Sequence, residues 1–221
     1  RIRQVYPGMA DDDMPAMVQH LRNHPDGPLA ELSRLQLEYA QLDSDLTQWT
    51  INTPRVDPDT RQALSPIRHA AAQRDRQQFA HAVRRCWRRE TSEPGGFRLQ
   101  FAEPLTGELP VLSANFDHVT SLELTGSDSN GQIVRFLQGF TRLRRLALNH
   151  FDLDDLPHPI TTMTSLRQLR LRHCGITLTP QNQLLLSSLN ELTALDLQGN
   201  PLGITMDVNA LSALHHLNLT D

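Results

Sequence analysis

The sequence predicts an α/β protein in which α-helices come first and parallel β-strands follow. Two observations support this prediction. Apolar residues recur every three or four positions between residues 28 and 50, and from residue 119 a short apolar pattern returns at nearly even intervals. The chain has 221 residues, of which 38% are hydrophobic, which is enough to bury an ordinary core. We expect an α-helical subdomain at residues 1–92 and a second, strand-containing unit at residues 93–221.

The strongest helical signal lies at residues 28–50. Large apolar side chains follow one another there in steps of three or four, which places them on one face of a helix of about six turns. Pro28 suits the first position, because its missing N–H would have no partner there. A shorter helix is expected at residues 14–21, capped by the aspartates at residues 11–13. Residues 1–10 are expected to be extended or loosely held.

A second long helix is predicted to begin at Asp57, whose side chain suits an N-cap, with Pro58 as its first residue. Ser65 and Pro66 repeat this pair, so we expect the helix to restart or kink there. The sequence Glu-Pro-Gly-Gly at residues 93–96 would end it. The helices should pack together and against the first strands.

The pattern that returns from residue 119 has apolar residues at its first, fourth and sixth positions. Its copies begin at residues 119, 143, 166, 192 and 214, at intervals of 24, 23, 26 and 22 residues. Leucine-rich repeats have intervals of about 20 to 29 residues. The sequence therefore predicts an α/β leucine-rich-repeat solenoid, with parallel strands on its concave face and return segments on its convex face.

A degenerate first repeat, which would serve as a cap, is expected at about residues 97–112. Leu99 and Phe101 lie 23 residues before Leu122 and Leu124, which keeps the register of the strands. A terminal repeat has only one neighbour, so its open edge needs a cover.

The return segments should differ from one another. Residues 131–140 have helical spacing, and residues 153–163 suggest an extended segment followed by a short 3-10 turn. Residues 180–189 should be helical, with Thr179 as the N-cap and Pro180 at the first position.

The ninth position of the repeat usually holds Asn or Cys, which bonds the backbone of the turn after the strand. Asn200 and Cys174 fit this role, and Ser127 could fill part of it. Phe151 cannot, so the turn after the second strand should be irregular or shielded by the ring.

The sequence contains no recognisable catalytic, metal-binding or cofactor-binding motif. The histidine pairs at residues 20/24 and 215/216 lack the Cys, Asp or Glu neighbours of a metal site. Cys86 and Cys174 are expected in structural, buried positions. The net charge is −4 and neither half is strongly basic, which argues against nucleic acid as a partner, and no apolar run is long enough to span a membrane.

The candidate site is the outward side of the strands. Solenoids present such faces to protein partners, and arginine favours interfaces because its planar fork bonds carboxylates. The alternative is a solvated face with self-compensating charges, such as Arg170 with Asp196. The candidate partner-binding residues are Glu123, Arg145, Asn149, Gln168, Arg170, Arg172, Asp196, Gln198, His216 and Asn218.

The stretch Cys-Trp-Arg-Arg that ends the helical region is followed by repeats that read HVTSLEL, TRLRRLALNHFDLDDLPHPI, TSLRQLRLRHCGITLTP and NELTALDLQGNPLG. Over roughly residues 60–221 this combination resembles the novel E3 ligase, or IpaH-like, effectors of Gram-negative bacteria, in particular their pseudomonad members. The resemblance implies a type III effector that is secreted into the host cytoplasm. In that family the repeats recruit a host protein substrate or restrain the ligase, and a separate helical domain carries the catalytic cysteine in a Cys-x-Asp motif.

That motif is missing here, because Cys86 is followed by Trp-Arg and Cys174 by Gly-Ile. No catalytic residue of the family can be assigned in this chain. The resemblance therefore implies a fragment that recognises the substrate and contacts the catalytic domain, which would lie beyond residue 221. The alternative is a stand-alone leucine-rich-repeat scaffold or binding protein without enzymatic activity, located in the cytoplasm.

Overall fold

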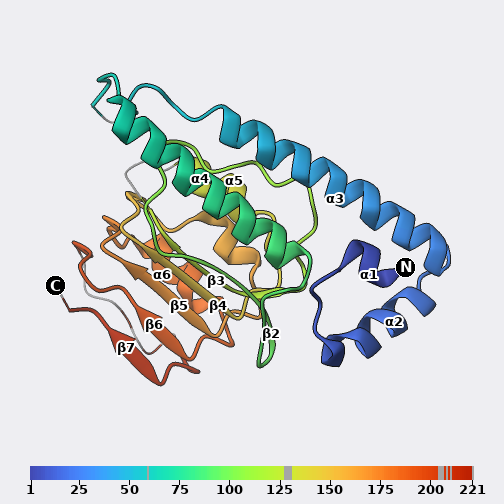
Figure 1. The fold of residues 1–221 in the computed structure, drawn as a ribbon. Helices are drawn as coiled ribbons and strands as arrows, with labels where there is room; N and C mark the ends of the chain where they lie inside the picture. Colours follow the sequence, from blue (N-terminus) through green and yellow to red (C-terminus); the bar gives the residue numbers. More distant parts are fainter. Residues whose placement is uncertain (59, 127–130, 204–206, 208, 210, 221) are drawn as a thin grey trace.

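The computed structural model describes residues 1–58, 60–126, 131–203, 207, 209 and 211–220. Within these residues, N-terminal helices precede a seven-stranded, mostly parallel sheet with interspersed helices (Figure 1). This confirms the α/β class that the sequence predicts. The elements are α1 (Ile2–Val5), η1 (Asp11–Asp13), α2 (Met14–Arg22), α3 (Pro28–Ile51), α4 (Pro66–Trp87), β1 (Ser92–Glu93), β2 (Gly96–Phe101), β3 (Val119–Thr125), α5 (Gly131–Leu137), β4 (Arg145–Asn149), η2 (His158–Thr162), β5 (Gln168–Arg172), α6 (Pro180–Ser187), β6 (Ala194–Asp196) and β7 (His216–Asn218).

The long helices α3 and α4 pack against each other along their apolar faces. Leu42 and Leu46 of α3 and Phe79 and Val83 of α4 are fully buried, as their spacing predicts. α4 also contacts β2, so it lies between α3 and the sheet (Figure 1). The buried side chains form one continuous core from the helices into the sheet, and a domain boundary at residue 92 stays a prediction.

The predicted helix start at Asp57 is wrong. α4 begins at Pro66, where the Ser65 hydroxyl accepts a backbone hydrogen bond of the first turn at 3.3 Å. Asp57 caps a turn instead: its N–H donates to the Gln62 carbonyl at 2.8 Å, and its carboxylate accepts from the Thr60 N–H at 3.1 Å. Both Asp-Pro and Ser-Pro can begin a helix, and only the second has a continuous apolar stripe after it.

The expectation of an extended or loosely held N-terminus is also wrong. Residues 1–10 include α1, and Val5, Tyr6 and Met9 are buried. Tyr6 stacks on Trp87 at the end of α4, with 5.4 Å between the ring centroids. Asp13 is the N-cap residue of α2 but makes no side-chain capping bond, and residues 11–13 form η1.

Strands β2 to β7 are parallel and lie side by side in the order of the sequence. The leucines at the fourth position of the pattern pair across neighbouring strands, and β2 joins the row through Leu99. The aligned residues are Leu122, Leu146, Leu169, Leu195 and Leu217. These leucines are 1–2% exposed in β3 to β6, whereas Leu217 of β7 is 39% exposed.

The first edge of the sheet carries a hairpin that the sequence analysis missed. β1 pairs antiparallel with β2, so residues 93–96 form a strand and turn, and the preceding helix ends at Trp87. A Cβ on Gly96 would lie 2.1 Å from the Thr120 hydroxyl oxygen, and the φ of Gly96 is +152°. Only glycine therefore allows this close approach of β2 to β3.

The return segments agree with their predictions. α5 and α6 are helices, and η2 follows an extended stretch. The Thr179 hydroxyl caps α6 by accepting from the Asn182 N–H at 3.2 Å. The first of these helices is shorter than expected, because α5 ends at Leu137.

Asn200 bonds the turn after β6 to the turn beside it. Its side-chain oxygen accepts from the N–H groups of Cys174 and Ile176 at 2.9 and 3.1 Å. Its side-chain nitrogen donates to the carbonyls of Leu171 and Leu197, both at 2.7 Å. The predicted role of Asn at the ninth position is confirmed.

The ninth position of the three earlier copies holds Cys174, Phe151 or Ser127. The Cys174 thiol lies 3.4 Å from the Leu148 carbonyl. Phe151 is buried, and a Cβ on Gly126 would lie 2.4 Å from its ring, so the ring packs against the residue that follows β3. Shielding of the turn after β4 by this ring stays a prediction. Ser127 lies outside the described residues.

Candidate functional site: the open face of the sheet

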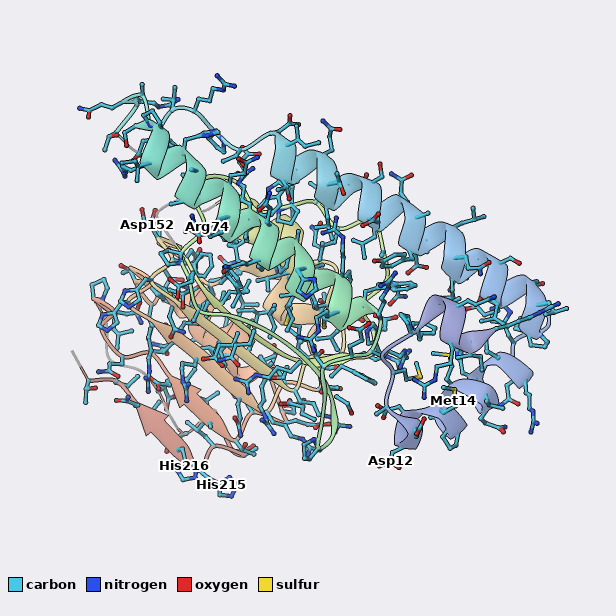
Figure 2. The ribbon with its side chains drawn as sticks, in the orientation of Figure 1. Asp12, Met14, Arg74, Asp152, His215 and His216 are labelled. Carbon is cyan, nitrogen blue, oxygen red and sulfur yellow. The ribbon has the colours of Figure 1, made fainter. Side chains whose placement is uncertain are left out.

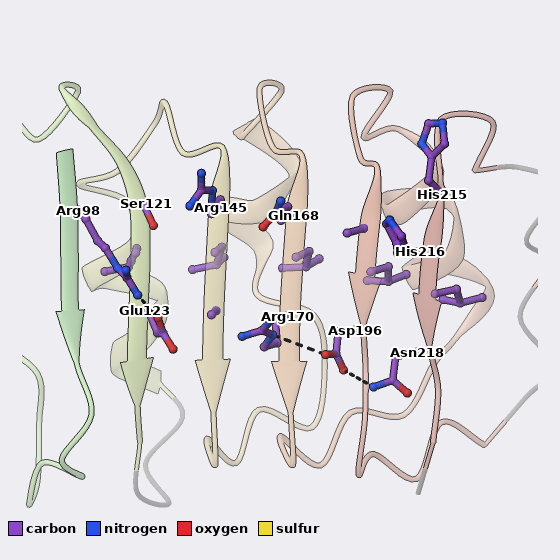
Figure 3. Close-up of a pocket in the computed structure, with 17 residues that line it drawn as sticks. Arg98, Ser121, Glu123, Arg145, Gln168, Arg170, Asp196, His215, His216 and Asn218 are labelled. Atoms are coloured by element: carbon purple, nitrogen blue, oxygen red, sulfur yellow. Dashed lines mark hydrogen bonds and ion pairs between the residues drawn. The ribbon is translucent and has the colours of Figure 1, made fainter. Parts of the chain in front are cut away.

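A groove runs across one face of the sheet from β2 to β7, and its volume is about 670 Å³. We call it the sheet-face groove. Figure 3 shows its side chains projecting from neighbouring strands. The side chains that line the groove include Arg98, Ser121, Glu123, Arg145, Ala147, Gln168, Arg170, Asp196, His216 and Asn218.

The strand alternation explains why these side chains share one face. In β4, Leu146 and Leu148 point into the core and are buried, whereas Arg145 and Ala147 line the groove. Because the strands are parallel and in register, each alternating position extends as a row across the sheet. The leucine pattern therefore determines both the core and the composition of the groove.

Most of the predicted partner-binding residues meet in this groove. Those brought together are Glu123, Arg145, Gln168, Arg170, Asp196, His216 and Asn218. Asn149, Arg172 and Gln198 lie outside its lining, towards the far end of the strands. Arg172 still contacts the groove residue Asp196, and Asn149 pairs with Arg172 in the sheet.

Arg98 and Ser121 line the groove although neither is among the predicted binding residues. Arg98 lies on β2, in the expected cap, and its register with β3 places it on the outward face. Ser121 occupies an outward position of β3 but is buried. Figure 2 shows His215 and His216 at the β7 end of the sheet.

Asp196 is the main acidic group of the groove, and two arginines neutralise it. Arg172 Nη2 lies 2.6 Å from one oxygen of this carboxylate. Figure 3 shows the other two contacts: Arg170 Nε lies 3.5 Å from the same oxygen, and the Asn218 amide donates to the second oxygen at 3.2 Å. Burial raises the pKa of Asp196, but the hydrogen bond and charge of Arg172 outweigh it and keep the pKa below its ordinary value. The carboxylate is charged at neutral pH.

The remaining groove charges are paired unequally. Arg98 and Glu123 form a close ion pair at 2.6 Å. Among the described residues, the one ionic contact of Arg145 is distant, at 3.9 Å from Glu93, and its side chain is 51% exposed. The Arg170 side chain is 47% exposed and shares its carboxylate partner with Arg172. The expected self-compensation is present, but it leaves Arg145 and Arg170 loosely held.

A second cavity lies beside α2 and α3, and it changes the interpretation of the histidine pair at residues 20 and 24. Glu31, which is 2% exposed, accepts two hydrogen bonds from Arg34 at 2.7 Å. His20 and His24 lie 3.5 and 3.3 Å from its oxygens. α3 therefore brings Glu31 close to both histidines, a neighbour in space that the sequence does not reveal.

This cavity is part of the framework that joins the helices to the sheet. Glu38 accepts from the Trp87 indole N–H at 3.1 Å and from the Asn115 N–H at 2.8 Å. Among the residues that the structure describes, no group of three or more His, Cys, Asp or Glu could hold a metal ion. In the same residues, no helix is long and apolar enough to cross a membrane.

In comparisons with known proteins, no family model matched the chain and no curated protein showed significant sequence similarity.

The two thiols have the properties of structural cysteines. Burial raises the pKa of Cys86 to about 12 and the pKa of Cys174 to about 11. A protonated, buried thiol is a poor nucleophile. The exposed guanidinium groups of the sheet-face groove are instead suited to non-covalent recognition.

Proposed function

We propose that residues 93–221 form a leucine-rich-repeat solenoid whose concave face contains the sheet-face groove. The aligned leucine row, the varied return segments and the backbone bonds of Asn200 support this fold. The β1–β2 hairpin would cover the first coil, as a terminal repeat requires.

The function that this geometry supports best is binding of another protein. One observation carries the proposal: an open groove crosses six neighbouring strands and presents two loosely held, half-exposed arginines at its middle. The planar guanidinium group of arginine can donate two parallel hydrogen bonds to a carboxylate of a partner, and it can also donate to backbone carbonyls.

The resemblance of its repeats supports the more specific proposal that the chain is the substrate-recognition or regulatory region of a secreted bacterial E3 ubiquitin ligase effector. The partner is a host protein in the host cytoplasm, and the catalytic domain lies outside this chain. The high pKa values of Cys86 and Cys174 support a catalytic cysteine outside this chain, because neither thiol is suited to carry ubiquitin.

Charge reversal in the groove tests the binding function. Arg145→Glu combined with Arg170→Glu should abolish capture of a host protein that the wild-type chain retains from a host-cell extract and that mass spectrometry identifies. The circular-dichroism spectrum should not change, since both side chains are about half exposed. The control reverses the exposed Arg22 and Arg74 on α2 and α4. Undiminished capture by the groove variant would place the interface elsewhere.

The ligase and the stand-alone scaffold differ in what accompanies this chain. Reading the gene beyond residue 221 decides between them: a helical domain with a Cys-x-Asp motif supports the ligase, and a stop codon or an unrelated domain supports the scaffold. A ubiquitin-transfer assay with the full-length product and the captured protein then measures the activity directly.

A further inference from the structure

We infer that the sheet-face groove recognises an acidic segment of its protein partner, and that Arg145 and Arg170 bind a carboxylate of that segment above Ala147. This inference rests on the proposed protein-binding function and specifies the chemistry of the partner.

The first support is the distribution of charge in the groove. The acidic side chains are already engaged: Glu123 by Arg98 at 2.6 Å and Asp196 by Arg172 at 2.6 Å. Once these pairs are formed, the groove keeps the positive charges of its two loosely held arginines. A partner segment would therefore meet a net positive surface.

The second support is the position of these two arginines around a small residue. Ala147 pairs in register with Glu123 on one side and with Arg170 on the other. Arg145 precedes Ala147 by two residues on β4 and so projects from the same face. Because the alanine side chain is short, the groove stays open above it, beside the positions of Arg145 and Arg170, and a partner side chain can enter there.

The third support is the set of hydrogen-bond donors around that opening. Arg145 and Arg170 carry guanidinium donors, and Gln168 pairs with Arg145 across the two strands and carries an amide donor. The positions beside Arg145 and Gln168 on the neighbouring strands are Ser121 and Ala194, which carry no charge. Asp196 lies beside Arg170, but its carboxylate is engaged by Arg172 at 2.6 Å. A carboxylate of the partner fits this donor set, because its two oxygens offer about four acceptor sites.

The opposite chemistry is disfavoured by the same arrangement. A lysine or arginine of the partner would have to displace Arg98 or Arg172 from its carboxylate, and it would approach two guanidinium groups whose own carboxylate contacts are distant or shared. Like charges at such a contact cost free energy and exclude the wrong partner. The groove therefore discriminates by charge as well as by shape.

The test uses the whole chain as bait for a random peptide library displayed on phage. We expect the enriched peptides to contain Asp or Glu at a shared position. A synthetic copy of one such peptide should lose binding by about tenfold when that acid is changed to Gln or Asn. Arg145→Gln and Arg170→Gln should each weaken the original peptide by a similar factor, and they should weaken the neutral peptide far less.

The matched control is Arg167→Gln. This arginine is more exposed than Arg145 and Arg170, it lies outside the groove and it pairs with Glu191 at 3.2 Å. It should leave peptide affinity within about twofold of the wild type. Thermal unfolding of all variants checks that the fold is unchanged.

Each outcome has a defined meaning. Enrichment of neutral or basic peptides that still require the groove would overturn this inference and leave the proposed binding function intact. If the wild-type chain enriches no peptide, both proposals are contradicted. If phosphoserine at the shared position binds tenfold more tightly than Glu, the assignment of a carboxylate is wrong.

Discussion

The helical region and the sheet face differ in how far their charged residues are buried and how fully they are paired. In the helices, Arg76 and Glu31 are only 3% and 2% exposed, and both have several fixed partners. On the sheet face, Arg145 and Arg170 are about half exposed and have one distant or shared partner each. The same residue types therefore serve two purposes within one chain.

Arg76 is an example of a buried charge with several hydrogen-bond partners. Its guanidinium donates to the carbonyls of Trp49 and Asn52 at the end of α3 and to those of Thr106 and Glu108 in the loop between β2 and β3. It also lies 4.5 Å from the centre of the Trp49 ring. Arg76 thus joins the helices to the loop that leads into the sheet, whereas Arg145 and Arg170 have only weak carboxylate contacts among the described residues.

The largest expected effect on the free energy of unfolding comes from replacing a buried arginine, in comparison with an exposed one. Arg76→Gln should lower the free energy of unfolding by about 3–5 kcal/mol, because buried carbonyls lose their donor and the ring contact disappears. Arg170→Gln should lower it by less than about 1 kcal/mol, because an exposed ion pair contributes little. Urea unfolding followed by circular dichroism measures both. Equal losses would break the distinction between the two regions.

Arg76 also shows what sequence reasoning could have found. Burial lowers its pKa to about 10, so it is charged at neutral pH, and a charged helical residue is normally assigned to solvent. Its position was a signal, however, since it lies on the same helical face as Ala72, Phe79 and Val83. The four carbonyl groups that accept its hydrogen bonds come from segments far away in the sequence, so their convergence could not be predicted.

The strands and their register were predictable for a different reason. The apolar pattern repeats locally, so each copy specifies its own strand and its alignment with the next one. The groove residues followed from this alternation. The pairing of Arg172 rather than Arg170 as the closer partner of Asp196 did not, because rotamers decide it. The β1–β2 hairpin was missed because its strand has only two residues.

The second prediction compares the leucine position of an interior strand, β5, with the same position of the last strand, β7. Leu169 and Leu217 occupy the same register position, but they are 1% and 39% exposed. Leu169→Ala should lower the free energy of unfolding by about 2–4 kcal/mol, because it leaves a cavity between two covered strands. Leu217→Ala should cost less than about 1 kcal/mol, because less apolar surface returns to water. The same urea titration measures both.

A loss at Leu217 as large as that at Leu169 would contradict this view. It would mean that the last strand is covered in solution, for example by another molecule, and the concentration dependence of the unfolding midpoint would show this. A matched polar control is Asn218→Ala, which changes the neighbouring outward position and leaves the leucine row intact.

The smallest expected effect concerns the pH dependence of the two kinds of carboxylate. The hydrogen bonds of Arg34, together with His20 and His24 and against the effect of burial, hold the pKa of Glu31 below its ordinary value of 4.5. A lowered pKa stabilises the fold above the unfolded-state pKa, and this contribution is lost as the pH falls through the folded-state pKa. Glu31→Gln should therefore be less stable than the wild type at neutral pH, and the difference should shrink below about pH 4.5.

Urea unfolding from neutral pH down to about pH 3 checks this difference. The control is Glu191→Gln on the sheet side, where the carboxylate is half exposed and pairs with Arg167 at 3.2 Å. At neutral pH its free energy of unfolding should lie within about 1 kcal/mol of the wild-type value, because water screens an exposed pair. A Glu31→Gln stability curve that runs parallel to the wild-type curve would show that the ion pairs of Glu31 contribute no more than an exposed one, and the contrast between buried and exposed charges would then apply to Arg76 alone.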